Sequence, residues 1–270
     1  MSRLIYVSGC SFTHGASWVN NLFENDSVEN FAAVGAGNCY IADSIIHFIN
    51  KNKKPDYVFA LFSGINRVDT VVPYSNLVKN SLETIQLRHA VLGSSAYFFS
   101  GGDRYTKLVK DNYKNINQFQ WPEVNSIEDF YTLSQEQQQH CVNSNIFWWQ
   151  DSGIENIINS YTMLQYLNNS EFLSDQTYQA IERFQNCLYR HNINYNFGFI
   201  HDPFDRGHHK HLGFLNKHSS RYHSIDWSKY VKISPYEFGV KHNLVSADGF
   251  HICPEGMNKW ADSIKQFFKT

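Results

Sequence analysis

Apolar runs alternate along this chain with segments in which apolar residues recur every three or four positions. The runs predict four strands, at about residues 4–7, 30–34, 57–62 and 195–200. The third run is apolar almost throughout, as is typical of a strand that is buried on both faces in a parallel sheet.

Helical spacing predicts helices near residues 18–23, 41–49, 178–189 and 254–268. The last begins with Pro254, which suits a first helical turn, and continues with an apolar stripe that would pack on a sheet. The stripe consists of Met257, Trp260, Ala261, Ile264, Phe267 and Phe268. Helices alternating with strands indicate the α/β class, here a three-layer α/β/α domain over 1–270 with a parallel, doubly wound sheet. Ligands bind such sheets at the carboxyl ends of the strands.

Two stretches, at about 70–170 and 201–245, are longer than a minimal fold of this class requires. The first holds many aromatic residues among Asn and Gln, and we expect a largely helical insertion or lid. Its aromatic side chains could form a wall around a sugar or acyl chain, although packing against the core explains most of them more simply. The second contains a His-rich loop. A divalent metal is one interpretation of it, but the spacing matches no standard motif and favours a polar loop without metal. The residues concerned are His201, Asp202, Asp205, His208, His209, His211, His218 and His223.

Composition narrows the function classes. Lys and Arg number 23 against 25 Asp and Glu, so no overall field favours nucleic acid or an anionic membrane as a partner. No apolar run approaches the roughly 20 residues that span a bilayer. The first residues enter a strand directly rather than a secretory signal, which predicts a cytoplasmic protein or one released by a non-classical route. Five cysteines without a C-x-x-C pair indicate reduced thiols. The oligomeric state stays open.

Candidate chemistry lies at the two ends of the chain. Ser11 follows the first predicted strand, and Asp248-x-x-His251 stands near the C-terminus. A serine hydroxyl becomes a useful nucleophile when an imidazole takes its proton, and a carboxylate fixes the tautomer of that imidazole. One tight turn could bring Asp248 to one ring nitrogen of His251 and leave the other facing outward.

Acyl transfer also needs donors aimed at the developing oxyanion. Gly35 lies in a glycine turn after the second predicted strand, where its backbone N–H can approach a ligand closely, and Gly37 is a possible substitute. Asn66 follows the third strand and offers a side-chain amide. Each of these residues also has a simpler explanation: Ser11 or Asn66 as a helix cap, the glycines as turn formers, and His251 as a loop histidine.

Together these segments resemble the four sequence blocks of the SGNH (GDSL-type) hydrolases. The matching residues are Gly9-Cys10-Ser11-Phe12, Gly35, Gly64-x-Asn66 and Asp248-x-x-His251. The resemblance covers about the first seventy and the last thirty residues. It implies an α/β/α fold, Ser11 as nucleophile, His251 as base and Asp248 as its partner. It also implies an oxyanion hole formed by the Ser11 N–H, the Gly35 N–H and the Asn66 side chain. The chain departs from the family at Cys10 and Arg67, where Asp is common.

These observations predict a serine esterase that hydrolyses carboxylic esters through an acyl-enzyme and needs no cofactor. By analogy with the family, O-acetyl groups of a carbohydrate are the favoured substrate, which would make the reaction a carbohydrate deacetylation. His14, Gly37 and Asn38 are expected to contact this small-molecule or glycan ester. An O-acyltransferase with the same triad, or a catalytically silent binding module, remains an alternative.

Overall fold

The computed structural model describes residues 2–51, 53–65, 67–73, 89–100, 170–205, 214–247 and 251–268. The chain divides into two compact units. The first joins residues 1–69 to residues 170–270, and the second comprises residues 70–169.

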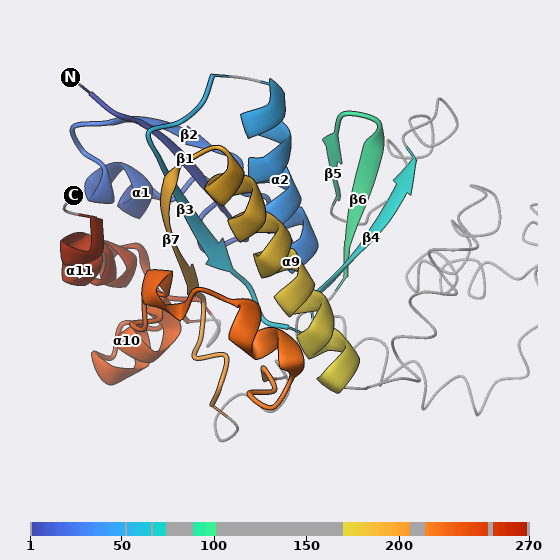
Figure 1. The fold of residues 1–270 in the computed structure, drawn as a ribbon. Coiled ribbons are helices and arrows are strands. Elements are labelled where there is room, and N and C mark those ends of the chain that lie inside the picture. Colours follow the sequence, from blue (N-terminus) through green and yellow to red (C-terminus); the bar gives the residue numbers. More distant parts are fainter. Residues whose placement is uncertain are drawn as a thin grey trace, which may run out of the picture. The chain divides into compact units, whose positions relative to one another are not determined.

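The first unit is built on a four-stranded parallel sheet (Figure 1). Its strands are β1 (Leu4–Gly9), β2 (Ser27–Asn30), β3 (Tyr57–Phe62) and β7 (Asn194–Phe199), and their order in the sheet is β2-β1-β3-β7. All three neighbouring pairs are parallel. The prediction of an α/β protein with a parallel sheet is therefore confirmed.

Helices cover both faces of this sheet (Figure 1). Successive residues of a strand point to opposite faces. On one face Phe59 contacts Trp18 of α1 (Ser17–Leu22), with ring centroids 6.2 Å apart. On the other face Phe62 contacts Phe184 of α9 (Ser170–Arg190) at 5.8 Å, and α2 (Asn38–Lys51) packs beside α9. Aromatic side chains therefore tie both helical layers to β3.

The C-terminal helix α11 (Pro254–Ile264) packs beside α1. Trp260 of α11 and Trp18 of α1 are fully buried and meet edge to face at 5.0 Å. The predicted stripe is buried except for Phe267, which is exposed. The reason is that α11 ends at Ile264 and tightens into the 3₁₀ segment η4 (Lys265–Phe268), which changes the spacing of the last side chains.

The predicted second strand at 30–34 is wrong, because β2 ends at Asn30. The side chain of Asn30 accepts a hydrogen bond from the N–H of Ala32 and donates one to the carbonyl of Thr13. This local turn competes with the strand and ends it. Phe31 instead stacks on Phe48 of α2, with centroids 3.9 Å apart. The other strands lie within two residues of their predicted bounds.

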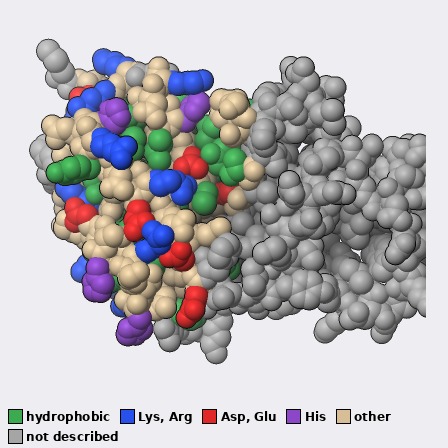
Figure 2. All heavy atoms as spheres, turned by 45° about the vertical axis from the view of Figure 1, so that its right-hand side comes forward, with side chains coloured by type: hydrophobic (Ala, Val, Ile, Leu, Met, Phe, Trp, Pro, Cys, Tyr) green, Lys and Arg blue, Asp and Glu red, His purple; other side chains and the backbone are tan. Residues whose placement is uncertain are grey.

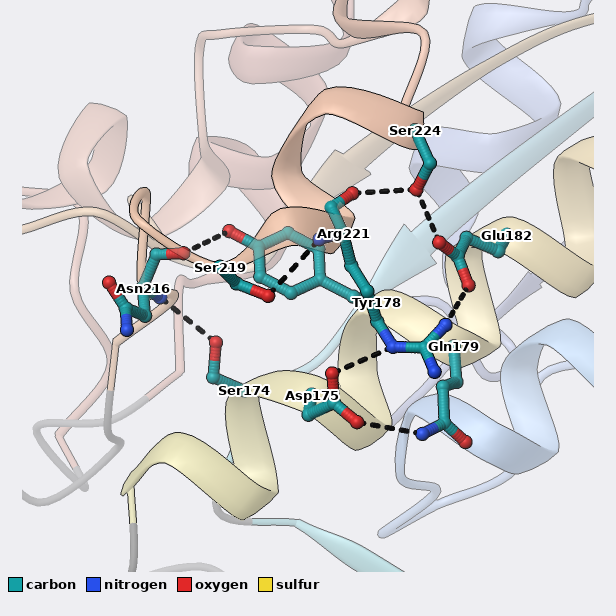
Figure 3. Close-up of polar contacts among 9 residues, drawn as sticks. All are labelled: Ser174, Asp175, Tyr178, Gln179, Glu182, Asn216, Ser219, Arg221 and Ser224. Carbon is teal, nitrogen blue, oxygen red and sulfur yellow. Dashed lines mark hydrogen bonds and ion pairs between the residues drawn. The ribbon is translucent and has the colours of Figure 1, made fainter.

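After β7 the chain forms two 3₁₀ segments, η2 (Ser220–Ser224) and η3 (Trp227–Lys229), and the helix α10 (Pro235–Lys241). A polar network joins η2 to α9 (Figure 3). Arg221 forms ion pairs with Asp175 at 2.7 Å and with Glu182 at 2.6 Å. The Tyr178 hydroxyl donates to the Asn216 carbonyl, 3.0 Å away. This network holds the segment after β7 against α9.

The described part of the second unit is β-structure. Strands β5 (His89–Leu92) and β6 (Ser95–Ser100) form an antiparallel hairpin, and β4 (Val68–Pro73), which begins in the first unit, completes a three-stranded sheet of order β4-β6-β5. A largely helical insertion was expected here, but residues 70–73 and 89–100 are strand and turn. The other residues of that stretch lie outside the described part.

The surface shows interspersed charge. On the face drawn in Figure 2, blue and red side chains of the described residues alternate without a large area of one sign. Among the described helices, none has the length and apolar character that crossing a membrane requires. The cysteines within the described ranges, Cys10, Cys39, Cys187 and Cys253, are free thiols.

Candidate active site

Ser11 and His251 lie in hydrogen-bond contact. The Ser11 Oγ is 3.1 Å from the His251 Nε2, although 240 positions separate the two residues. For the hydroxyl to donate in this bond, Nε2 must carry no proton, which places the ring proton on Nδ1. The ring of Phe12 packs against the imidazole, with centroids 5.2 Å apart. The 3.1 Å separation of the Ser11 Oγ and the His251 Nε2 is within the range over which a base can activate a serine.

The topology of the sheet explains where Ser11 lies. The chain leaves β1 for β2 on one side and later returns to β3 on the other side of β1. The connecting helices α1 and α2 lie on opposite faces, so the loops diverge at the carboxyl end of β1 (Figure 1). Ligands of open parallel sheets bind at such a point, and Ser11 lies two residues beyond it.

A tight turn presents the Ser11 side chain. The N–H groups of Thr13 and His14 both donate to the carbonyl of Cys10, at 2.9 and 3.0 Å. Cys10 and Thr13 are fully buried, whereas Ser11 is partly exposed. Ser11 is not a helix N-cap, because α1 begins only at Ser17 and has Ala16 at its N-cap. That simpler explanation of Ser11 is therefore wrong.

A backbone hydrogen bond and an antiparallel bridge hold His251 and the residue that follows it. Its carbonyl accepts from the N–H of Ser246 at 2.7 Å, and an antiparallel bridge joins Val245 to Ile252. Ile252 is buried where α10 and α11 meet, and α11 starts two residues later. His251 therefore lies just before the start of α11, a helix that packs in the core. Asp248, the expected partner of His251, lies outside the described residues.

Two of the three candidate oxyanion donors, the N–H groups of Ser11 and Gly35, lie within the described residues. Gly35 has φ +90°, a conformation that favours glycine, within a turn closed by the Ala36 N–H donating to the Ala33 carbonyl at 3.1 Å. The Ala33 N–H donates to Gly9 at the end of β1 at 3.1 Å, which ties this turn to the Ser11 strand. Within the described ranges, no group accepts a hydrogen bond from the N–H of Gly35 or of Ser11. Asn66 lies outside those ranges.

Gly37 and Asn38, two of the expected substrate contacts, use polar groups in hydrogen bonds inside the protein. The Gly37 N–H donates to the Asp69 carboxyl at 2.7 Å. Asn38 is 3% exposed; its oxygen accepts from the Ser63 N–H at 2.8 Å, and its amide donates to the Thr177 hydroxyl at 3.1 Å. Because the Gly37 N–H already donates to Asp69, it does not serve in place of the Gly35 N–H as an oxyanion donor. Contact of Gly37 or Asn38 with a substrate stays a prediction.

His14, the third expected substrate contact, is exposed on the same turn as Ser11. Its Nδ1 lies 2.8 Å from the carbonyl of Ala32. A carbonyl only accepts, so Nδ1 carries the proton of this bond and Nε2 is directed elsewhere. This orientation leaves His251 as the imidazole at the Ser11 oxygen, and contact between His14 and a substrate stays a prediction.

Asp69 is a residue of this region that the sequence did not single out. Its two carboxyl oxygens accept from the N–H groups of Gly37 and Tyr40, at 2.7 and 2.6 Å, at the start of α2. Burial raises the pKa of Asp69 to about 7, although both hydrogen bonds act in the opposite direction. No local pattern could have indicated this role, because the partners lie about thirty positions away.

Among the described residues, no three His, Cys, Asp or Glu side chains are placed so that they could hold a metal ion together. His201 is buried at the end of β7, while His218 and His223 belong to the segment around η2. His208, His209 and His211 fall outside the described ranges.

Comparison with known proteins adds no assignment: no protein-family model matches the chain, and no curated protein is significantly similar to it. The site must therefore be interpreted from its own geometry and from the motifs in the sequence.

Proposed function

We propose that the protein is a serine hydrolase that cleaves carboxylic esters through an acyl-enzyme. The observation that carries this proposal is the 3.1 Å contact between the Ser11 Oγ and the His251 Nε2 at the carboxyl end of β1. Serine–imidazole contact of this kind is the geometric signature of an activated nucleophile. The unoccupied N–H groups of Ser11 and Gly35, within the described ranges, supply donors for an oxyanion.

The reaction begins when the Ser11 oxygen attacks the ester carbonyl carbon. The hydroxyl proton passes to His251 Nε2, and the carbonyl electron pair moves onto the oxygen, which the two N–H groups stabilise. Collapse of this intermediate breaks the bond to the alcohol, which leaves with the proton from Nε2. His251 then takes a proton from water, whose oxygen attacks the acyl carbon. Collapse of this second intermediate breaks the bond to Ser11, returns the proton to the Ser11 oxygen and releases the acid. Asp248 would accept from the Nδ1–H and keep the ring in this tautomer.

The parallel sheet of order β2-β1-β3-β7 with helices on both faces is an α/β fold, the class that the resemblance to the SGNH hydrolases implies. The four sequence blocks also lie in the family's order along the chain. Short-chain esters, such as O-acetyl groups on a carbohydrate, are the substrate class that this resemblance implies. Fold likeness by itself does not establish a substrate, so the proposal depends on the site residues.

A fluorophosphonate probe tests the nucleophile. We expect one label per chain, on Ser11, and a burst of p-nitrophenol from p-nitrophenyl acetate. Ser11→Ala should remove both, with a loss of turnover of at least about 10³-fold and an unchanged fold. Ser17→Ala is the matched control, because Ser17 is an exposed serine on the neighbouring helix α1. A label on another residue, or equal product release by wild type and Ser11→Ala, would overturn the proposal.

A further inference from the structure

The turn that carries Gly35 is clamped from two sides. From the β1 side, the Ala33 N–H donates to the carbonyl of Gly9. From the β3 side, the Ser63 hydroxyl donates to the carbonyl of Ala36 at 3.0 Å. The glycine itself supplies no conformational preference of its own, because it populates positive and negative φ about equally. The direction of the Gly35 N–H is therefore set by its neighbours in space.

Asp69 provides the strongest of these constraints. Its carboxyl bridges the Gly37 and Tyr40 N–H groups, two of the donors that the first turn of an α-helix leaves without a helical partner. The approach is close: a Cβ added at Gly37 would lie 2.6 Å from the Asp69 Oδ1 and 2.6 Å from the Arg67 carbonyl. The segment after β3 thus fixes the backbone two residues beyond Gly35.

We propose that Asp69 is a positioning residue for catalysis, which holds the turn at residues 35–38 so that the Gly35 N–H points at the oxyanion. This inference rests on the proposed function, because it assigns Asp69 a role in the same acyl transfer. Asp69 touches no reacting atom in this scheme. It acts through the backbone of Gly37 and α2, and its effect is on the transition state rather than on substrate binding.

The chemistry of the carboxyl group explains why an amide cannot replace it. A carboxyl group presents an acceptor oxygen to each of the two N–H groups. Asp69→Asn keeps the shape but has only one oxygen, so an NH₂ group would face the N–H of either Gly37 or Tyr40 and the turn would relax. A displacement of about 1 Å at a catalytic group can cost about 100-fold in rate.

The test compares Asp69→Asn with Asp26→Asn in steady-state ester hydrolysis and in the rate of phosphonate labelling at Ser11. Asp26 is a matched control, because it also accepts from a backbone N–H and a side chain, those of Arg3, at the opposite end of the sheet. We expect Asp69→Asn to lower kcat by about 10- to 100-fold with KM nearly unchanged. The labelling rate should fall in parallel, and Asp26→Asn should retain the wild-type kcat.

Ser63→Ala is a second, milder variant in case Asp69→Asn does not fold. It removes the hydrogen bond to Ala36 from the same turn and should also lower kcat while KM stays the same. Folded variants with wild-type kcat, or a rise in KM alone, would overturn the positioning role and leave the proposed function intact. A wild-type protein that neither turns over esters nor takes a label on Ser11 would overturn both.

Discussion

Gly239→Ala offers a sharp test of how His251 is supported. Gly239 is buried in α10 and faces Ile252, the residue next to His251. An added Cβ would lie 2.8 Å from the Ile252 Cγ1, 3.2 Å from its Cγ2, and closer still to its Cδ1. Contacts this short cannot be accommodated without a shift of the Ile252 side chain.

Two opposing effects set the magnitude. Alanine is favoured over glycine inside a helix by about 1 kcal/mol. Overpacking a well-filled core costs about 1–3 kcal/mol. The short contacts to Ile252 make the second effect the larger one, so we expect Gly239→Ala to lower the free energy of unfolding by up to about 2 kcal/mol. A displaced Ile252 would also move His251, and kcat should fall by up to about 100-fold.

The assay is a double-mutant cycle with Ile252→Ala, measured by urea unfolding. Ile252→Ala alone should cost about 2–5 kcal/mol, because it leaves a cavity. In that background no isoleucine branch remains to be displaced, so Gly239→Ala should become stabilising by about 0.5–1 kcal/mol. A reversal of sign between the two backgrounds is the expected result. If Gly239→Ala stabilises both backgrounds, or destabilises both equally, Ile252 does not depend on Gly239 and the reasoning fails.

The hydrogen bonds and ion pairs of Asn38, Asp69 and Arg221 lead to three further predictions. Asn38→Ala should lower the free energy of unfolding by about 1–3 kcal/mol, because the buried Ser63 N–H loses its acceptor, while KM stays unchanged; a raised KM at full stability would restore the substrate contact. Burial raises the pKa of Asp69 to about 7, so the folded protein retains a proton that the unfolded chain releases near its ordinary value. The stability of wild type relative to Asp69→Asn should therefore be greatest below about pH 4 and fall by up to about 4 kcal/mol as the pH rises through 7; a relative stability that increases with pH would contradict the assignment. Arg221→Met should lower Tm at low salt, and the deficit should shrink at high salt because the ion pairs with Asp175 and Glu182 are exposed to screening. Lys241→Met, on α10, is the control for the loss of a surface charge. If the decrease in Tm of Arg221→Met did not depend on salt, packing rather than charge would explain it.

Local pattern was enough to predict the elements that pack on an apolar face. The continuous apolar run of β3 is buried at every position, and most of the stripe on α11 is buried against the same core. The position of Ser11 after a strand also followed from the sequence, since strand ends are marked by where apolar runs stop. These features depend on residues within a few positions of one another, and periodicity records them.

The tertiary structure decided what depends on distant partners. The end of β2 at Asn30 required a hydrogen bond to Thr13 of another loop, and the structural role of Asn38 required Ser63 and Thr177. Asp69 became part of the site only because its strand brings it to the start of α2. The contact of Ser11 with His251 likewise joins two ends of the chain. A one-dimensional pattern names the groups able to make such bonds, but the packing of the sheet and helices selects which groups meet.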